Sequence, residues 1–339
     1  MSDAFVSLQN LSLSYGKTIV VPELSLDIRK GELIALLGPS GCGKTTTMRA
    51  IAGLMTPHSG NILIDGTDVT RTAANKRGIG LVFQSYALFP HLTAFENVAF
   101  GLRLQKLSKS EITSRTEKGL QTVGLSHLAE RKPAEMSGGQ QQRLSLARSL
   151  VMRPKVLLLD EPLSNLDARL RLNMRSELQR LQRETGITMI FVTHDQAEAL
   201  ALADRIVLMK DGKIEQLGTA DDLYNYPQTK FAADFFGFEN IFTVNGAEIA
   251  GESGSLPLSF EVEDGYLAWR PSSVIVGNGP YQGIVRGVAF AGEQREYVIK
   301  AAVGQIKAAS PVNDPSFEIG ASVAFDLPQA RALHLQTRA

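Results

Sequence analysis

Short apolar runs alternate with amphipathic stretches over residues 5–236. Several runs are continuously or almost continuously apolar, which is typical of strands buried on both faces of a parallel sheet: residues 33–37, 79–83, 156–159 and 188–192. Between the last two runs, Leu170, Met174, Leu178 and Leu181 recur at helical spacing. Their neighbours are expected to form a solvated face: Arg169, Arg171, Arg175, Arg180 and Arg183. Strands alternating with helices predict an α/β fold with a mostly parallel, doubly wound sheet.

Two stretches depart from this alternation. Residues 5–35 alternate and turn in the manner of an antiparallel β-layer. Residues 93–135 are helical in pattern, because Phe95, Val98 and Leu102 follow helical spacing. We expect an all-α subdomain over about residues 93–150, inserted between two halves of the α/β domain.

The pattern changes near Asn240. Beyond it, short alternating runs are punctuated by Gly and Pro, as at residues 266–269, 283–286, 296–299 and 322–325. Such spacing predicts a small all-β barrel or sandwich. We therefore expect two domains, residues 1–238 and 239–339.

Composition narrows the class of protein. The 339 residues are 44% hydrophobic and 21% charged, as in globular proteins, and the net charge is zero. This balance argues against a nucleic-acid binder that depends on bulk charge. The single cysteine, Cys42, excludes an internal disulfide and fits a reducing compartment. The N-terminus lacks the pattern of a signal peptide, and no apolar stretch approaches the ~20 residues of a membrane helix.

One stretch matches the phosphate-binding loop pattern G-x-x-x-x-G-K-T. It consists of Gly38, Pro39, Ser40, Gly41, Cys42, Gly43, Lys44 and Thr45. An apolar strand precedes it and a helical run follows, so backbone N–H groups and the helix N-terminus are expected to bind phosphate. We expect Lys44 to reach the β- and γ-phosphates and the Thr45 hydroxyl to hold Mg²⁺. Cys42 is either a reactive thiol near this helix or a small buried filler.

Polar side chains stand at three further strand ends. Asp160 and Glu161 follow the run at 156–159, and Gln84 and His194 follow two other runs. Strand ends at one edge of an α/β sheet are where ligands bind. Together these groups fit phosphoryl transfer to water, with Asp160 near Mg²⁺, Glu161 orienting or deprotonating the water and His194 near the γ-phosphate. Taken singly, each residue has an ordinary structural explanation.

Two features lie outside this set. Ser137 is a candidate N-cap, and the turn that it forms with Gly138 and Gly139 has the character of a second anion site. Tyr15 stands in a glycine-flanked turn, where it stacks on a nucleotide base or covers the sheet edge.

With these motifs in order, residues 3–236 resemble the ATP-binding subunit of an ABC transporter. The residues that match the family's motifs are the phosphate loop with Thr46, the glutamine-loop residue Gln84, the signature from Met136 through Gln140, the run ending in Asp160 and Glu161, the segment Ser164, Asn165, Leu166 and Asp167, and the switch His194. Met136 stands where the family usually has Leu, a swap of similar volume. Under the resemblance, Tyr15 stacks on adenine, and Thr45, Gln84 and Asp160 hold the metal.

The resemblance also implies cofactors and partners. ATP and Mg²⁺ are the expected cofactors. Two copies are expected to face each other head to tail, each ATP lying between the phosphate loop of one copy and Ser137, Gly138, Gly139 and Gln140 of the other. The resemblance also implies integral-membrane permease subunits as partners, an extracytoplasmic solute-binding protein that acts indirectly, and no nucleic-acid partner. It implies a peripheral location on the cytoplasmic face of the inner membrane.

The C-terminal part narrows the resemblance further. Residues 268–271 and 283–286 are similar to the β-rich regulatory domain of importer ATPases for sugars, polyamines, ferric iron and phosphonates. Residues 83–93 lean toward polyamine importers such as those for spermidine and putrescine. Two alternatives compete with this interpretation. A soluble ABC ATPase acting on DNA or ribosomes predicts a basic surface, zinc-binding cysteines or a long coiled-coil insertion, and the sequence has none of these. A nucleotide-binding regulator that does not hydrolyse is disfavoured by the presence of Glu161 and His194.

Overall fold

The computed structural model describes residues 4–164, 166–251 and 254–336. The chain divides into two compact units, Met1–Ala220 and Asp221–Ala339, and each unit has its own hydrophobic core. The first unit is α/β and the second carries the C-terminal strands, which confirms the expected fold class. The predicted boundary after residue 238 lies inside the second unit and stays a prediction about independent folding.

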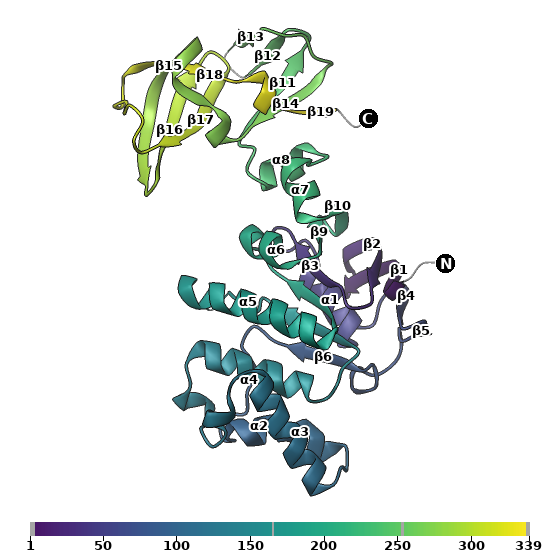
Figure 1. The fold of residues 1–339 in the computed structure, drawn as a ribbon. Coiled ribbons are helices and arrows are strands. Elements are labelled where there is room, and N and C mark those ends of the chain that lie inside the picture. Colours follow the sequence, from purple (N-terminus) through teal and green to yellow (C-terminus); the bar gives the residue numbers. More distant parts are fainter. Residues whose placement is uncertain (1–3, 165, 252–253, 337–339) are drawn as a thin grey trace. The chain divides into compact units, whose positions relative to one another are not determined.

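A mostly parallel sheet forms the centre of the first unit, in the order β10-β9-β3-β8-β7-β6 (Figure 1). Its β9 and β10 are antiparallel, and the other neighbours are parallel. The strands are β3 (Leu33–Leu37), β6 (Ile79–Val82), β7 (Val156–Asp160), β8 (Thr188–Val192), β9 (Arg205–Lys210) and β10 (Lys213–Gly218).

The register of these strands brings the candidate site residues to one edge. Val82 pairs with Leu159, Leu159 with Phe191, and Phe191 with Ala35. Because the strands run in the same direction, the residues that follow each of these positions leave the sheet side by side. The positions two or three residues beyond this row are therefore neighbours at one edge of the sheet, and they are occupied by Gln84, Glu161, His194 and Gly38.

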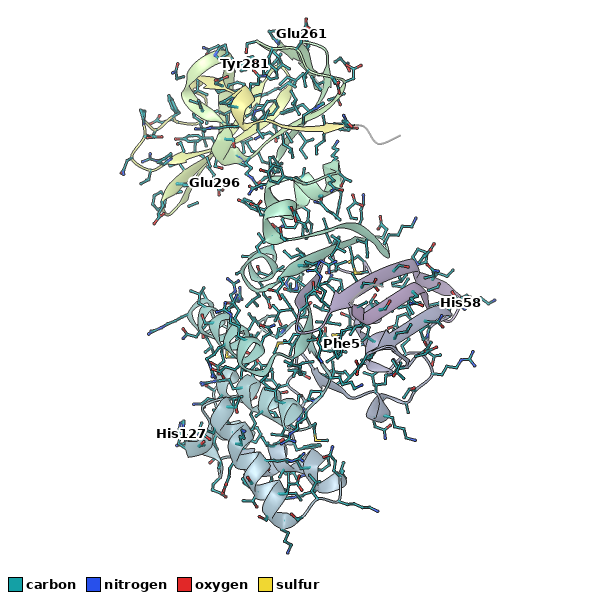
Figure 2. The ribbon with its side chains drawn as sticks, turned by 45° about the vertical axis from the view of Figure 1, so that its right-hand side comes forward. Phe5, His58, His127, Glu261, Tyr281 and Glu296 are labelled. Atoms are coloured by element: carbon teal, nitrogen blue, oxygen red, sulfur yellow. The ribbon has the colours of Figure 1, made fainter. Side chains whose placement is uncertain are left out.

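An antiparallel layer lies beside this sheet, in the order β2-β1-β4-β5. It comprises β1 (Ala4–Tyr15), β2 (Thr18–Arg29), β4 (Ser59–Ile64) and β5 (Thr67–Asp68). Helix α1 (Lys44–Ala52) buries Met48 and Ile51 in one core that joins both layers. Phe5, labelled on β1 in Figure 2, packs against this core. Of the stretch 5–35 expected to form this layer, only the part up to Arg29 does so, and residues 33–37 belong to the parallel sheet. The layer also includes β4 and β5 from further along the chain.

The helical subdomain is formed by α2 (Ala94–Leu104), α3 (Lys109–Thr122) and α4 (Gly138–Leu150), which pack on one another. Thr93 and Glu96 form a capping box that begins α2. The remaining helices of this unit are α5 (Ala168–Thr185) and α6 (Gln196–Leu202), and short 3₁₀ turns occur at Ala74–Lys76, Ser126–Leu128 and Pro133–Glu135. The prediction of a solvated arginine face on α5 is wrong for Arg171 and Arg175, which are half-buried where α6 packs.

The second unit holds two antiparallel sheets around one core. The first has the order β13-β12-β11-β14-β19 and the second β17-β16-β15-β18. Trp269 and Tyr297 are buried between them, and the Tyr281 hydroxyl, labelled in Figure 2, donates to the Pro257 carbonyl at 2.8 Å. The strands are β11 (Asn240–Asn245), β12 (Glu248–Ala250), β13 (Ser255–Pro257), β14 (Gly265–Trp269), β15 (Ile275–Ala291), β16 (Gln294–Ala301), β17 (Gly304–Pro311), β18 (Ser322–Asp326) and β19 (Leu333–Gln336), with 3₁₀ turns at Pro271–Ser273 and Gln329–Arg331.

Arg270 explains why the connecting helices α7 (Ala220–Asn225) and α8 (Lys230–Phe235) belong to the all-β unit. Its guanidinium lies 3.7 Å from the ring centroid of Tyr224 and 4.2 Å from that of Phe238. It also donates to the backbone carbonyls of Phe236 and Tyr224. Stacking and charge-assisted hydrogen bonds at one side chain therefore hold this helical segment on strand β14.

Candidate active site

The phosphate loop joins β3 to α1, and glycine is required where it passes close to neighbouring strands. A Cβ on Gly38, whose φ is +148°, would lie 2.2 Å from the Met209 carbonyl oxygen on β9. A Cβ on Gly43 would lie 2.7 Å from the Val21 side chain on β2. The loop can therefore adopt this path only with bare backbone at both positions.

Lys44 is buried and its ammonium points into the loop. It donates to the carbonyls of Gly38 at 2.7 Å and Pro39 at 2.8 Å, and it lies 3.7 Å from the Cys42 sulfur. The Cys42 side chain is 4% exposed. This burial favours the small-filler interpretation of Cys42 over a reactive thiol, because a reactive cysteine needs access to solvent.

Thr45 and Asp160 meet at the start of α1 and the end of β7. Burial, followed by the adjacent charge of Glu161, raises the pKa of Asp160 overall, against smaller lowering effects of the Arg49 charge and of a hydrogen bond from the Thr45 side chain. Hydroxyl and carboxylate oxygens are donors that Mg²⁺ prefers. Of the residues expected at the metal, these two therefore lie together.

Glu161 has a backbone φ of +45°, which is uncommon for a residue with a side chain. Its N–H donates to the Val192 carbonyl of β8 at 3.0 Å, and its own carbonyl accepts from the Ser164 hydroxyl at 3.1 Å. These bonds hold a conformation that costs roughly 1–2 kcal/mol in an isolated residue. Strain that is held in this way is a feature of functional sites.

Gln84 and His194 meet at the Glu161 carboxylate. The Gln84 amide nitrogen donates to Oε2 at 3.1 Å, and His194 Nδ1 lies 3.2 Å from Oε1. Gln84 also donates to the Ser164 hydroxyl at 3.1 Å. The His194 side chain is 58% exposed, so its ring faces solvent as well as the carboxylate. The three residues expected to be catalytic are therefore brought together.

The segment before α5 lies against this group. Ser164 contacts Gln84 as described, and Asp167 caps α5 by accepting from the Leu170 N–H at 2.9 Å. Asn165 falls outside the described residues. Arg171, one turn into α5, donates to the Leu166 carbonyl at 3.2 Å and pairs with Asp195 at 3.4 Å. Helix α5 is thereby linked to the residue that follows His194.

Glu198 holds both neighbours of His194. It accepts from the Thr193 hydroxyl at 2.7 Å, and its N–H donates to Asp195 at 3.0 Å. The same Thr193 hydroxyl accepts from the Asp195 N–H at 3.0 Å. Glu198 is 3% exposed, and burial raises its pKa to about 7. The turn that carries His194 is thus fixed from inside the protein.

The Ser137 turn forms a capping box at the start of α4. The Gln140 N–H donates to the Ser137 hydroxyl at 3.4 Å, and the Ser137 N–H donates to the Gln140 side chain at 2.9 Å. Gly139 lies against Leu170 of α5, where a Cβ would come within 2.8 Å. The hydrogen bonds of Ser137 and Gln140 join them to each other, and this turn is not part of the cluster around Glu161.

Tyr15 ends strand β1 and is 50% exposed. A hydrogen bond from the Thr46 side chain, together with a weaker one from Arg49, lowers its pKa. Tyr15 thus stands beside the first turn of α1 with its ring open to solvent. This position is compatible with both interpretations of the residue, stacking on a base or covering the sheet edge.

Several residues that shape the site escaped the sequence reasoning. Glu198 and Arg171 hold the His194 turn, and Arg148 on α4 contacts the loop after Gln84. The one available signal was helical spacing: Ser145 and Arg148 lie on one face of α4 and both reach the Tyr86 carbonyl. No motif spacing marks Glu198 or Arg171.

The fold and the site define an ATPase of the phosphate-loop class. The model of the protein family described as ABC transporter matches residues 21–164. Two relatives are both named Fe(3+) ions import ATP-binding protein FbpC. The one from Rhizobium etli is 49% identical over 314 residues, 89% of each chain. The one from Brucella suis is 46% identical over 331 residues, 94% of each chain.

A solved structure indicates the same family. That of cbiO1 from Clostridium perfringens, described as part of the ABC transporter complex cbiONQ, has 31% identity and a TM-score of 0.63. The match covers 66% of this chain and 92% of the other. This chain belongs to the ABC transporter family, as the ATP-hydrolysing subunit of an importer. Within the described ranges, none of the helices combines the length and the apolar character needed to cross a membrane.

Replacing Glu198 by Gln tests whether burial raises the pKa of this carboxyl group. The pKa of Glu198 is raised from 4.5 to about 7, so its contribution to stability is complete below about pH 4.5 and is lost as the pH rises to about 7. Gln keeps the acceptor for Thr193 and carries no charge. The free energy of unfolding of Glu198→Gln, relative to the parent, should therefore increase by about 3 kcal/mol between roughly pH 4.5 and pH 8.

Denaturant unfolding followed by helical circular dichroism measures this difference. Glu117→Gln, at an exposed position of α3, is the control for the loss of a carboxylate. A constant difference between Glu198→Gln and the parent across the pH range would show that the pKa of Glu198 is not raised by folding.

Proposed function

We propose that this chain hydrolyses ATP at Glu161 to drive solute import. The observation that carries the proposal is the Glu161 carboxylate held between Gln84 and His194, at 3.1 and 3.2 Å. Glu161 accepts the proton of the attacking water, Gln84 orients the carboxylate and the water, and His194 contacts the γ-phosphate. Lys44 and the loop N–H groups bind the phosphates, and Tyr15 stacks on the adenine.

The residues present fit Mg²⁺. Thr45, Asp160 and Gln84 offer hydroxyl, carboxylate and amide oxygens, which are hard ligands suited to this ion. The described residues contain no cluster of three or more His, Cys, Asp or Glu that could hold a metal by itself. Mg²⁺ is commonly bound by one or two carboxylates together with substrate phosphates. When bound, the ion neutralises charge on the phosphates.

We infer that the active form is a homodimer. The start of α4 combines a capping box with two glycines, so its first turn is an anion site without side-chain bulk. The phosphate loop of the same chain already provides a site for one ATP. A second anion site is useful if it binds the γ-phosphate held by another copy, and two-fold symmetry provides this at both sites.

A groove beside the glutamine loop is the proposed contact for the permease. It has a volume of about 530 Å³ and is lined by Phe83, Ala87, Phe89, Phe100 and Arg148 among others. Phe83 and Phe100 are large, exposed apolar residues. We propose that a permease segment docks here, which places the chain peripherally on the cytoplasmic face of the inner membrane. Residues 239–339 then serve as a regulatory domain.

Ferric iron is the solute that we propose. The relatives from Rhizobium etli and Brucella suis, which align over 89% and 94% of this chain, bear the name of ferric iron importers. These names favour ferric iron as the imported solute over the polyamine that the resemblance of residues 83–93 suggests. The solute itself is bound by the permease and an extracytoplasmic binding protein, so this chain supplies energy and makes no contact with iron.

Mixing two inactive variants tests the shared site. Lys44→Ala removes a phosphate-loop contact and Ser137→Arg blocks the α4 anion site, so each should abolish hydrolysis alone. In a mixed dimer, one site combines two intact halves and the other carries both lesions. Phosphate release should therefore return in part on mixing. Hydrolysis at the parent rate by a Ser137→Arg monomer would exclude the shared site.

Uptake by cells tests which solute the transporter imports. A strain of the source organism that lacks this chain should lose ATP-dependent uptake of radiolabelled ferric iron and keep uptake of spermidine. Complementation with the parent chain should restore iron uptake, and complementation with Lys44→Ala should not. Loss of spermidine uptake with normal iron uptake would reverse the assignment.

A further inference from the structure

The loop after Gln84 contains two successive residues in the left-handed region. Tyr86 has a φ of +60° and Ala87 a φ of +49°, and neither is glycine. Such conformations are unfavourable for residues with a Cβ and persist where surrounding contacts hold them. Within the loop, the Tyr86 N–H donates to the Phe83 carbonyl at 2.8 Å and the Ala87 N–H to the Ser85 carbonyl at 2.7 Å.

The contacts that hold these residues come from α4. Arg148 donates to the Ala87 carbonyl at 2.6 Å and to the Tyr86 carbonyl at 3.1 Å. The Ser145 hydroxyl donates to the same Tyr86 carbonyl at 3.0 Å. The Arg148 guanidinium also lies 5.6 Å from the centroid of the Phe89 ring. The planar guanidinium places a separate nitrogen at each carbonyl, Nη1 at Ala87 and Nη2 at Tyr86.

The loop connects three functional places. At its start, Gln84 contacts Glu161 and Ser164. At its end, the Phe89 N–H donates to Asn97 at 2.9 Å, and the Phe89 ring lines the proposed permease groove. Arg148 itself lies on α4, the helix that begins at the Ser137 turn. A shift of the loop therefore changes the surroundings of both Glu161 and the groove.

We propose that Arg148 is a positioning residue that sets the backbone of residues 84–89, and thereby links the permease groove to Gln84 and to the signature helix. It acts through the Tyr86 and Ala87 carbonyls. The inference rests on the proposed function, since the groove is assigned there to the permease. It adds that movement of the groove reaches Gln84 through the Arg148 guanidinium, which joins α4 to residues 86 and 87.

Arg148→Lys tests this role, because lysine keeps the charge but has a single nitrogen in place of the two that Arg148 uses on the Tyr86 and Ala87 carbonyls. The variant should lower kcat for ATP hydrolysis by roughly tenfold, since small displacements of positioning groups have large effects on rate. KM for ATP should stay unchanged, because the phosphate loop is untouched. Amide hydrogen exchange of residues 84–89 should increase, while exchange of residues 38–46 should not.

The matched control is Arg143→Lys. Arg143 lies on the same helix and donates to the Val123 carbonyl at 3.4 Å, away from the loop. It should leave kcat and the exchange of residues 84–89 at parent values. A residue that merely supports the fold would change KM and the exchange of α4 as a whole, so these readouts separate positioning from general destabilisation.

Ala87→Gly supplies a second test that depends on the strain. Glycine adopts a φ near +49° without steric cost, so the loop needs less support from Arg148. The double variant Ala87→Gly, Arg148→Lys should recover a large part of the lost kcat and of the lost protection. Failure of this rescue, with both variants folded, would contradict the role of Arg148 in holding the loop.

Reconstitution with the permease separates the inference from the proposed function. The parent chain should be stimulated by the permease in vesicles, and Arg148→Lys should show much less stimulation. If the parent is not stimulated, the proposed function fails. If the parent is stimulated and Arg148→Lys responds equally, with normal exchange of residues 84–89, the inference about Arg148 is overturned.

Discussion

The backbone of Glu161 is the constraint on which the site depends. Its left-handed conformation is held by the Val192 carbonyl from the neighbouring strand and by Ser164 from the turn that follows. This conformation aims the carboxylate at Gln84 and His194, which reach it from two different strand ends. A residue in ordinary β geometry would continue the line of β7 and would not meet both partners. The strain at this position is therefore part of how the site is assembled.

Parallel pairing explains why chain segments far apart in sequence arrive at the same place. The row through Val82, Leu159, Phe191 and Ala35 is fixed by the backbone hydrogen bonds of four adjacent strands. Each strand contributes one site residue two or three positions further on. Around this row, helix contacts fix the loops: Glu198 holds the turn of His194, and Arg148 holds the loop of Gln84. The sheet brings the groups together, and the buried polar side chains set their orientation.

Much of this arrangement is predictable from the sequence. The apolar run before Asp160 and Glu161 predicts a buried strand with carboxylates at its end, and the glycines around Lys44 predict the phosphate loop. The capping of α4 by Ser137 is also confirmed. What escapes prediction is the direction of polar side chains inside the protein. The arginines of α5 look alike in sequence, yet Arg171 pairs with Asp195 and Arg180 binds Glu177 and Glu184 at the surface, because only tertiary packing distinguishes the two faces.

The most direct test of the account is phosphate release by Glu161→Gln at saturating Mg-ATP. Gln has the same size and cannot accept a proton from water, so the rate should fall by about 10²–10⁴-fold. ATP should still bind with parent affinity, because Lys44 and the loop are unchanged, and a nucleotide-bound dimer should accumulate in size-exclusion chromatography. Phosphate release near the parent rate would contradict the central role of Glu161.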